Sequence, residues 1–386
     1  MKRMLLPALL FTTLTACTAA PAGTLPAAAP TPTPASTPAP TAAPAPADAL
    51  TLEEKIGQLF IIRPDALDLT LPQETINDAK ADGVTTLTDA MRETLQAYPV
   101  GGICQFGKNI TDPEQLAQFN ADLQAASRTP LFIAVDEEGG AVARLANHPA
   151  FDLPQYESAA AVGASGDPAD ACAMGQTIGA YLKEYGFNMD FAPDADVNTN
   201  PDNPIIGTRA FSSDAATAAE MAAAAADGLR TSGILPTLKH FPGHGDTAED
   251  SHTALAVTYK TLDELLPFAA DTGLHAVMVG HIAAPNVTGD DTPATLSPQL
   301  VALIPDAENT LIVTDSLAMD AITAAYTPGE AAVQALQAGC DVLLMPNSLP
   351  EAYAAVLEAV QNGTISEERL DRSVNKILLY KQQFAS

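Results

Sequence analysis

The sequence predicts an α/β fold, and within that class a single (β/α)8 TIM barrel. Short apolar runs alternate with longer amphipathic runs from residue 49 to the end of the chain. Eight of the short runs have the length of buried strands, and strands that alternate with helices form parallel sheets. An open sheet has the same order of elements, so it stays open as an alternative.

Each predicted strand is an apolar run of four or five residues bounded by polar or turn-forming residues. The eight runs are Gln58–Ile62, Gly102–Gln105, Leu131–Val135, Met189–Ala192, Leu235–Leu238, Ala276–Gly280, Leu311–Thr314 and Val342–Met345. The predicted helices are Asp112–Ala126, Ala169–Tyr185, Ser213–Arg230, Leu262–Thr272, Gly329–Ala338, Pro350–Gln361 and Glu367–Phe384. Gly186 and Gly233 stand just after two of these helices, where glycine is a frequent end signal. The connection Pro64–Tyr98 is unusually long and holds a helical pattern at Leu87–Ala97.

The first residues form a targeting segment rather than part of the fold. Lys2 and Arg3 precede an apolar stretch that is too short to span a bilayer. The stretch ends in Leu14-Thr-Ala-Cys17, which resembles the lipobox of bacterial lipoproteins and implies cleavage before Cys17 and lipid attachment to its sulfur. An ordinary secretory signal is the alternative. We therefore expect a signal peptide at residues 1–16 and an exported protein that is lipid-anchored to the outer face of the cytoplasmic membrane.

The segment after the predicted signal is a linker, and the chain as a whole is acidic. Residues 17–48 are almost wholly Ala, Pro and Thr, so they cannot build a core, and their prolines favour an extended tether. The chain has 18 basic and 47 acidic residues, a net charge of −29. That charge argues against nucleic acid and against electrostatic adsorption to anionic lipid. We expect one folded domain at residues 49–386 and contact with the membrane through the lipid alone.

Polar side chains follow five consecutive predicted strands. These polar groups begin at Asp136, Asp194, Lys239, His281 and Asp315. The carboxyl ends of barrel strands meet at one face, which is where barrel enzymes hold their active sites. We therefore expect these side chains to form one site. The two glycines that follow Glu138 suit either the close approach of a ligand or a tight turn.

The segment Lys239–His252 holds three of the chain's six histidines and three carboxylates, directly after the fifth strand. Such a cluster indicates a catalytic or ligand-binding loop, because histidine changes charge near neutral pH. A solvated acidic loop is the alternative. One residue separates Asp250 from His252, so a turn can bring the two side chains into contact. The carboxylate would then orient the ring and stabilise its protonated form.

Asp315 follows the buried pattern Thr-Leu-Ile-Val-Thr, so its carboxylate should lie at the mouth of the barrel. In that position it could act as a nucleophile, a general base or a metal ligand. A helix N-cap at the start of the next segment is the alternative, because aspartate caps helices well.

These motifs resemble those of glycoside hydrolase family 3, and more narrowly its bacterial β-N-acetylglucosaminidase branch. The Lys239–His252 segment is similar to the family signature. Four further segments match in family order: Leu50–Phe60, Asp136–Gly140, Gly207–Phe211 and Thr314–Met319. The resemblance covers nearly all of residues 49–386. It implies a TIM barrel and a retaining, double-displacement mechanism, in which the sugar is held covalently between two steps.

By motif position, the resemblance implies a role for each candidate residue. Asp315 would be the nucleophile, His252 the acid/base and Asp250 its partner. The residues implied to bind sugar hydroxyls are Asp136, Arg209, Lys239, His240 and His281, with Arg144 as a further candidate. The implied activity is an exo-β-N-acetylglucosaminidase that removes terminal β-linked GlcNAc from peptidoglycan fragments. We expect a monomer without cofactor or metal ion, and GlcNAc-containing muropeptides as its carbohydrate substrates.

Three positions depart from the family pattern, and other functions stay open. Glu137 and Ala141 stand where the family commonly has Gln and Arg, and Asp194 replaces a more usual apolar residue. A β-glucosidase or β-xylosidase of the same family is the nearest alternative. The others are a sugar-binding lipoprotein without turnover and a metal-dependent hydrolase. A metal site would use His240, His244, Asp246, His252 and Asp315, but the segment lacks the HExxH spacing of helix-borne sites.

Overall fold

The structure is a computed structural model, and it describes residues 47–252, 254–261, 268 and 273–385. The predicted signal peptide, Cys17, nearly all of the linker and nearly all of the predicted helix Leu262–Thr272 lie outside the described residues. Ala47 and Asp48, which the sequence analysis assigns to the linker, form a 3-10 turn, η1 (Ala47–Ala49). The Ala47 N–H donates to Asn375 Oδ1 at 3.0 Å, so the packed structure includes these two residues.

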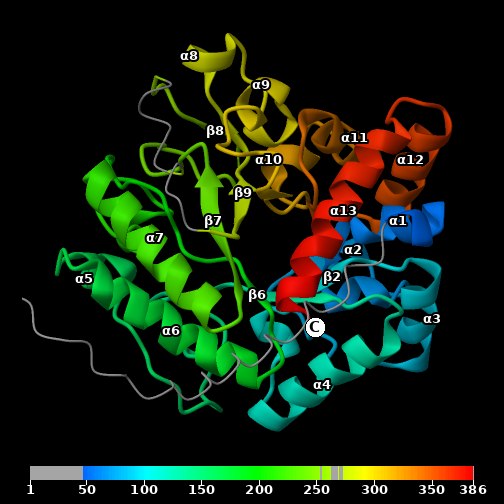
Figure 1. The fold of residues 1–386 in the computed structure, drawn as a ribbon, viewed down its shortest axis with the longest axis horizontal. Helices are drawn as coiled ribbons and strands as arrows, with labels where there is room; N and C mark the ends of the chain where they lie inside the picture. The colour runs from blue at the N-terminus through cyan, green and yellow to red at the C-terminus, as the bar shows by residue number, and fades with distance from the viewer. Residues whose placement is uncertain (1–46, 253, 262–267, 269–272, 386) are drawn as a thin grey trace, which may run out of the picture. The chain divides into compact units, whose positions relative to one another are not determined.

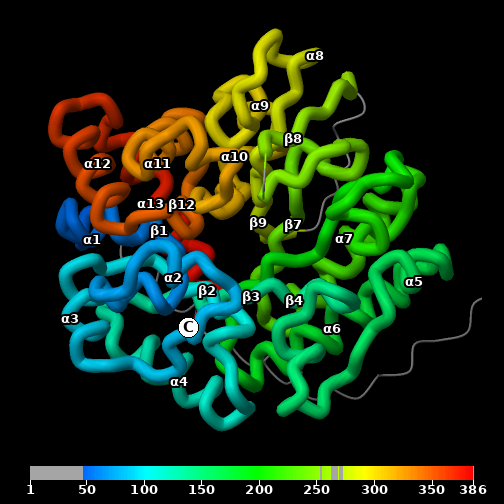
Figure 2. Tube along the Cα trace, turned by 180° about the vertical axis from the view of Figure 1, so that it is seen from behind, coloured from blue at the N-terminus to red at the C-terminus, as the bar shows by residue number. Residues whose placement is uncertain are grey.

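Eight parallel strands form a nearly closed barrel, as the sequence predicts. They are β1 (Phe60–Ile62), β2 (Gly102–Cys104), β3 (Phe132–Val135), β6 (Met189–Asp190), β7 (Leu235–Phe241), β9 (Ala276–Val279), β11 (Leu311–Thr314) and β12 (Leu343–Leu344). Hydrogen bonds join them in the order β11-β9-β7-β6-β3-β2-β1-β12. A parallel bridge between Val313 and Val342 brings the two ends of this order together, so the alternative of an open sheet is wrong. Figure 2 shows strands around the centre and helices outside them.

Helices surround the barrel (Figure 1), and a polar residue stands at the N-cap of each. They are α1 (Leu52–Gln58), α4 (Pro113–Ala126), α6 (Pro168–Glu184), α7 (Ala215–Thr231), α11 (Pro328–Ala338), α12 (Leu349–Gln361) and α13 (Glu367–Phe384). The side chains of Asp112, Asp167 and Asp214 accept backbone N–H groups in the first turns of α4, α6 and α7. Gly186 and Gly233 follow α6 and α7 with a φ of +82° each, which glycine adopts without steric cost. In the part of the chain that the structure describes, no helix is long and apolar enough to cross a membrane.

Shorter elements occupy the connections between the strands. The short helices are α5 (Ala159–Gly163), α8 (Pro285–Thr288), α9 (Pro298–Val301) and α10 (Asp320–Thr323), and the 3-10 turns are η3 (Gly107–Asn109), η4 (Gly207–Arg209) and η6 (Ala294–Leu296). Two small two-stranded pairs follow strand ends: the antiparallel pair of β4 (Glu137–Gly139) with β5 (Val142–Ala143), and the parallel pair of β8 (Ala256–Val257) with β10 (Ile282–Ala283). Gly139 and Gly140 have φ of +81° and +65°, so these two glycines make the tight turn of the first pair.

The long connection after β1 folds against the carboxyl end of the barrel. It contains η2 (Pro64–Leu67), α2 (Gln73–Asn77) and α3 (Asp89–Ala97), of which α3 matches the predicted helical pattern. Lys108 Nζ donates to the carbonyls of Thr75 and Ile76 at 2.9 Å each, which satisfies the end of α2. The Asn109 amide donates to Asp65 Oδ2 at 2.8 Å. Side chains from the β2 connection therefore fix this segment in place.

Candidate active site

A pocket of about 180 Å³ opens at the carboxyl ends of the barrel strands. The charged and histidine side chains that line it are Arg63, Asp136, Glu138, Arg144, Arg209, Lys239, His240, His244, His252 and Asp315. The barrel thus brings together the polar strand ends that the sequence analysis singles out. Of the site residues predicted in the folded domain, Asp250 and His281 stand behind this lining rather than in it.

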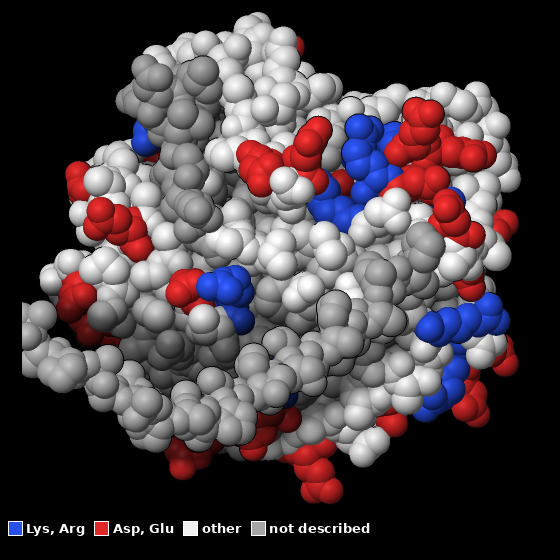
Figure 3. Space-filling model, viewed as in Figure 1, with Lys and Arg blue, Asp and Glu red and all other residues white. Residues whose placement is uncertain are grey.

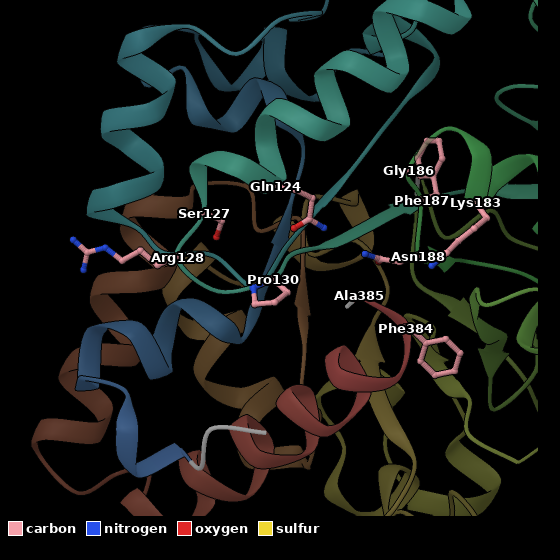
Figure 4. Close-up of a pocket in the computed structure, with 10 residues that line it drawn as sticks. All are labelled: Gln124, Ser127, Arg128, Pro130, Lys183, Gly186, Phe187, Asn188, Phe384 and Ala385. Carbon is pink, nitrogen blue, oxygen red and sulfur yellow. The ribbon is translucent and has the colours of Figure 1, made fainter. Parts of the chain in front are cut away.

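A second, larger depression of about 430 Å³ lies at the other end of the barrel, beside the start of β3 and the end of α13 (Figure 4). Among the described residues, its walls hold no carboxylate and no histidine. Two of its polar side chains already bind backbone. Gln124 exchanges two hydrogen bonds with Leu131, at 2.8 and 2.9 Å, and Asn188 accepts the Ile133 N–H at 2.8 Å. We therefore assign the candidate active site to the smaller pocket.

Lys239, near the end of β7, is the centre of a buried ion-pair network in the pocket. Its Nζ lies 2.8 Å from Asp136 Oδ1 and 2.6 Å from Glu138 Oε1. Arg209 in η4 holds Glu138 with two hydrogen bonds, at 2.8 and 2.7 Å. Burial by itself would raise the pKa of Glu138, but Lys239 and Arg209 hold that pKa well below its usual value. The network therefore keeps two carboxylates and two cations charged inside the protein.

Asp196 fixes His240 in one orientation. The two side chains meet at 2.7 Å between His240 Nδ1 and Asp196 Oδ2, and Asp196 Oδ1 accepts the His244 N–H at 2.5 Å. Burial alone would lower the pKa of His240, but the hydrogen bond to Asp196 raises it above its usual value. Because Nδ1 faces the carboxylate, Nε2 is the ring nitrogen left on the side of Arg209, whose Nη2 is 3.5 Å away.

His244 shapes the loop that follows β7. Its Nε2 lies 3.0 Å from Ser251 Oγ and its Nδ1 lies 2.5 Å from Thr247 Oγ1, so both ring nitrogens are engaged within the loop. At Gly245 a Cβ atom would stand 1.9 Å from the carbonyl oxygen of Val197, so only glycine fits there. The loop is thereby held against the segment that follows β6.

Asp315 comes directly after β11, and its side chain lines the pocket. Its Oδ1 accepts the Ser316 N–H at 2.7 Å. The next helix, α10, begins only at Asp320 with Met319 as its N-cap, so the helix-capping alternative for Asp315 is wrong. Burial alone would raise the pKa of Asp315, but His281, His240 and the Ser316 N–H hold it below its usual value. A nucleophile needs this ionised state.

Asp250 and His252 form the contact that their spacing predicts. Asp250 Oδ1 lies 2.8 Å from His252 Nδ1, and it also accepts the His252 backbone N–H at 2.8 Å. The carboxylate therefore orients the ring with Nδ1 as its donor, which leaves Nε2 to exchange a proton. The His252 side chain lines the pocket and is 64% exposed, so a bound molecule at the mouth of the pocket can reach it.

His281 lies directly behind Asp315 rather than in the pocket wall. The residue is fully buried, with Nδ1 2.6 Å from Thr295 Oγ1 and Nε2 2.9 Å from the Ser316 carbonyl oxygen. Burial lowers the pKa of His281 below its usual value. Both ring nitrogens are engaged, so this geometry favours a positioning role beside Asp315 over direct contact with a sugar.

Arg63 and Phe106 line the pocket but have no role in the sequence analysis. Arg63 follows β1 directly, and Phe106 follows the β2 segment. The rule that singled out Asp136 and Asp315, a polar group at the end of a buried strand, also applies to Arg63. Glu138 was noted only for the glycines after it, although it forms the central ion pair. Glu137 points away from the pocket and binds the Leu145 and Ala146 N–H groups at 2.9 Å each.

Among the described residues, one group brings three possible metal ligands within reach of one another: Asp194, Asp196 and His240. Of the five ligands considered from the sequence, this group contains only His240. Asp246 instead accepts the Thr258 hydroxyl at 2.9 Å. A cation in the group would face Arg209, whose Nη2 is 3.5 Å from Asp194 Oδ2, so the donor set is poorly suited to a metal ion.

Comparison with known proteins gives a consistent family assignment. Residues 51–379 match the sequence profile described as "Glycosyl hydrolase family 3 N terminal domain". "Beta-hexosaminidase A" of Pseudoalteromonas piscicida is 33% identical over 335 residues, which cover 77% of this chain and 56% of that protein. "Beta-hexosaminidase LpqI" of Mycobacterium tuberculosis is 32% identical over 347 residues, which cover 81% of this chain and 83% of that protein.

A solved structure is also similar to this chain. It is a glycoside hydrolase family 3 β-N-acetylglucosaminidase from Paenibacillus sp., with a TM-score of 0.77 and 38% sequence identity. The match covers 87% of this chain and 63% of that one. The chain thus spans less than two thirds of the Paenibacillus and Pseudoalteromonas proteins, and most of LpqI.

Asp194 generates a prediction about stability and pH. Burial and the neighbouring Asp196 raise the pKa of Asp194 to about 7. An unfolded aspartate ionises near pH ~3.9, so between about pH 4 and 7 the folded state holds the extra proton, and this group's contribution to stability falls as pH rises. Asp194→Asn has no proton to lose. We therefore expect the difference in melting temperature, variant minus unsubstituted protein, to rise from about pH 4 to pH 7 and then to level off. Thermal unfolding measures both temperatures. A difference that stays constant across this range would contradict the raised pKa.

Proposed function

The chain belongs to glycosyl hydrolase family 3, and from this membership we propose that it is a retaining exo-β-N-acetylglucosaminidase. One observation supports the proposal most directly. The same pocket is lined by an ionised carboxylate, Asp315, and by a histidine, His252, whose ring is oriented by Asp250. These are the two chemical functions that a double displacement at a sugar needs.

In the first proposed step, an Asp315 oxygen forms a bond to the anomeric carbon while the bond to the leaving-group oxygen breaks. His252 donates its Nε2 proton to that oxygen, and Asp250 stabilises the ring while it is positively charged. In the second step, water attacks the anomeric carbon and gives its proton to His252. Asp315 then leaves as a carboxylate, so the enzyme returns to its starting state.

The ion-pair network would hold the sugar for this attack. Lys239 and Arg209 are cations fixed by Glu138, and Asp136 is a carboxylate fixed by Lys239. Charged groups in fixed positions make strong hydrogen bonds to hydroxyls, and they orient a substrate because they do not themselves reorganise. His240 presents Nε2 beside Arg209, so it suits a further hydroxyl.

The proposed substrate is a terminal β-linked GlcNAc, and peptidoglycan fragments are its proposed source. The names of two curated relatives, both β-hexosaminidases, and the N-acetylglucosaminidase of Paenibacillus support the amino sugar over glucose or xylose. Glucosidase or xylosidase activity of the same family is the competing proposal, because the ion-pair network binds hydroxyls that all these sugars share.

The activity is tested with 4-nitrophenyl β-glycosides of GlcNAc, glucose and xylose. We expect the highest kcat/KM for the GlcNAc compound, and a loss of at least about 10³-fold in Asp315→Asn because the nucleophile is gone. The control is Asp170→Asn, an exposed carboxylate on α6 that should leave activity unchanged. A slow fluorinated substrate should add its sugar mass to Asp315. Label on another carboxylate, or preference for glucose or xylose, would contradict the proposal.

The acid role of His252 predicts a dependence on the leaving group. His252→Ala should lose about 10²-fold or more in kcat on alkyl glycosides or disaccharides, because these leaving groups need a proton. The loss on 4-nitrophenyl glycosides should be much smaller in the first step, since nitrophenolate leaves unaided. His148→Ala, a histidine outside the pocket lining, is the matched control. Equal losses on both substrate types would show that His252 is not the acid.

We also propose that the chain is exported and held by a lipid on Cys17, a residue outside the described part of the structure. The support is the lipobox-like sequence before Cys17 and the Ala/Pro/Thr-rich linker after it. A bacterial host fed with tagged palmitate should label the full chain and retain it in the membrane fraction. Cys17→Ser should lose both properties, and Cys172→Ser should keep both. Label that persists in Cys17→Ser, or none in the unsubstituted chain, refutes the anchor.

A further inference from the structure

Two arginines and an aromatic ring form a cationic group at one side of the pocket. The Arg63 cluster consists of Arg63, Phe106 and Arg144, all of which line the pocket. The guanidinium carbons of Arg63 and Arg144 lie 4.7 and 5.8 Å from the centre of the Phe106 ring. These cation–π contacts with the ring stabilise both guanidinium groups without consuming their N–H donors.

The cluster gives the pocket lining a net positive charge, although the protein as a whole is acidic. The lining has four cations, Arg63, Arg144, Arg209 and Lys239, and three carboxylates, whereas the chain has a net charge of −29. On the face shown in Figure 3, acidic side chains are scattered widely and basic ones gather in a few places. Arg209 and Lys239 form close ion pairs with Glu138 and Asp136, so the surplus positive charge resides on Arg63 and Arg144.

Neither arginine of the cluster is fully paired with the described residues. Arg63 donates to Asn77 Oδ1 at 2.7 Å. Arg144 Nη2 is 3.7 Å from Asp136, and its buried Nε has no hydrogen-bond partner in the described part of the chain. Burial lowers the pKa of Arg63, and Asp65 and Asp136 only partly offset that effect. A desolvated guanidinium with unused donors is a site that an anion would stabilise.

The long connection after β1 positions Arg63. Asn77, the last residue of α2, accepts from Arg63 and donates to Asn347 Oδ1 at 2.7 Å, on the far side of β1 after β12. Lys108 binds the end of α2 and so fixes Asn77. The segment that had no function in the sequence analysis therefore has one in the structure: it sets the orientation of Arg63.

The order of the strands places the Arg63 cluster opposite the proposed acid. In the ring of eight, β7 and β1 are four strands apart in either direction, so they face each other across the barrel. His252 belongs to the loop after β7, and Arg63 follows β1 directly. The leaving group must lie beside His252. A substrate group beside Arg63 then belongs to the other, non-reducing side of the sugar.

We propose that the Arg63 cluster is a subsite for an anionic substituent, a carboxylate or a phosphate, on the non-reducing side of the sugar bound in the pocket. Arg63 binds the anion with its planar N–H fork, and Arg144 adds a second charge. The substrates would then include acidic N-acetylhexosaminides besides neutral GlcNAc. This inference rests on the proposed function, because that function identifies the pocket as a sugar site.

Calorimetric titration tests the subsite without requiring turnover. The probes are N-acetylglucosamine, N-acetylglucosamine 6-phosphate and N-acetylmuramic acid, which carry no charge, a phosphate and a carboxylate. At least one acidic sugar should bind about tenfold or more tightly than the neutral one, as expected for charge-assisted hydrogen bonds. Arg63→Met should reduce this preference to about twofold or less and leave the affinity for the neutral sugar nearly unchanged. Arg128→Met, which removes an exposed arginine, is the control for net charge.

The outcomes separate the subsite from the proposed activity. Weaker or equal binding of both acidic sugars, an equal loss of all three in Arg63→Met, or no binding at all would overturn the subsite. If Arg63→Met does not fold, Arg63→Gln replaces it, because glutamine keeps a polar group near Asn77. The same loss of preference for the acidic sugar is then expected. If an Arg63-dependent preference is found while no N-acetylhexosaminide is hydrolysed, the subsite stands and the proposed activity fails. The probe that shows the preference identifies phosphate or carboxylate as the anion.

Discussion

The ion pairs of Lys239 are the interaction on which the rest of the site depends. Its side chain is 3% exposed, and an ammonium group at that depth is stable only beside compensating charge. Asp136 and Glu138 supply that charge from the end of β3 and from β4, and Glu138 in turn holds Arg209. One buried cation thereby ties together chain segments that lie far apart in the sequence. Removing Lys239 would leave Asp136 and Glu138 with one compensating cation fewer.

The pocket divides its polar groups by how completely they are paired. Glu138 pairs closely with both Lys239 and Arg209, which makes all three rigid groups for orienting a substrate. Asp315 and His252 stand apart from that network. Asp315 is held ionised by its neighbours, and His252 is held by Asp250 through one nitrogen only. A group that transfers a proton or forms a covalent bond must be oriented and must still have an atom available to react. The division between the two sets therefore matches the proposed chemistry.

Much of this arrangement could be predicted residue by residue. The eight strands were predictable because a buried strand is a short apolar run, and that is a local property. Asp136, Lys239 and Asp315 were predictable because each ends such a run. Arg63 satisfies the same rule, but the long connection that follows it obscures the strand end. Glu138 was missed because its partner Arg209 is 71 residues away along the chain.

By itself, the sequence determined the element types, the barrel class and the polar strand ends, since each depends on residues within a few positions of one another. It also determined the contact between Asp250 and His252, which a single turn can close. Only the tertiary structure decided which strand ends face each other. It placed the Arg63 cluster opposite the loop of His252, set Asp194 beside Arg209, and buried His281 behind Asp315. These outcomes depend on how the eight strands pair and close into a ring, because pairing and closure together set the distances between residues on different strands.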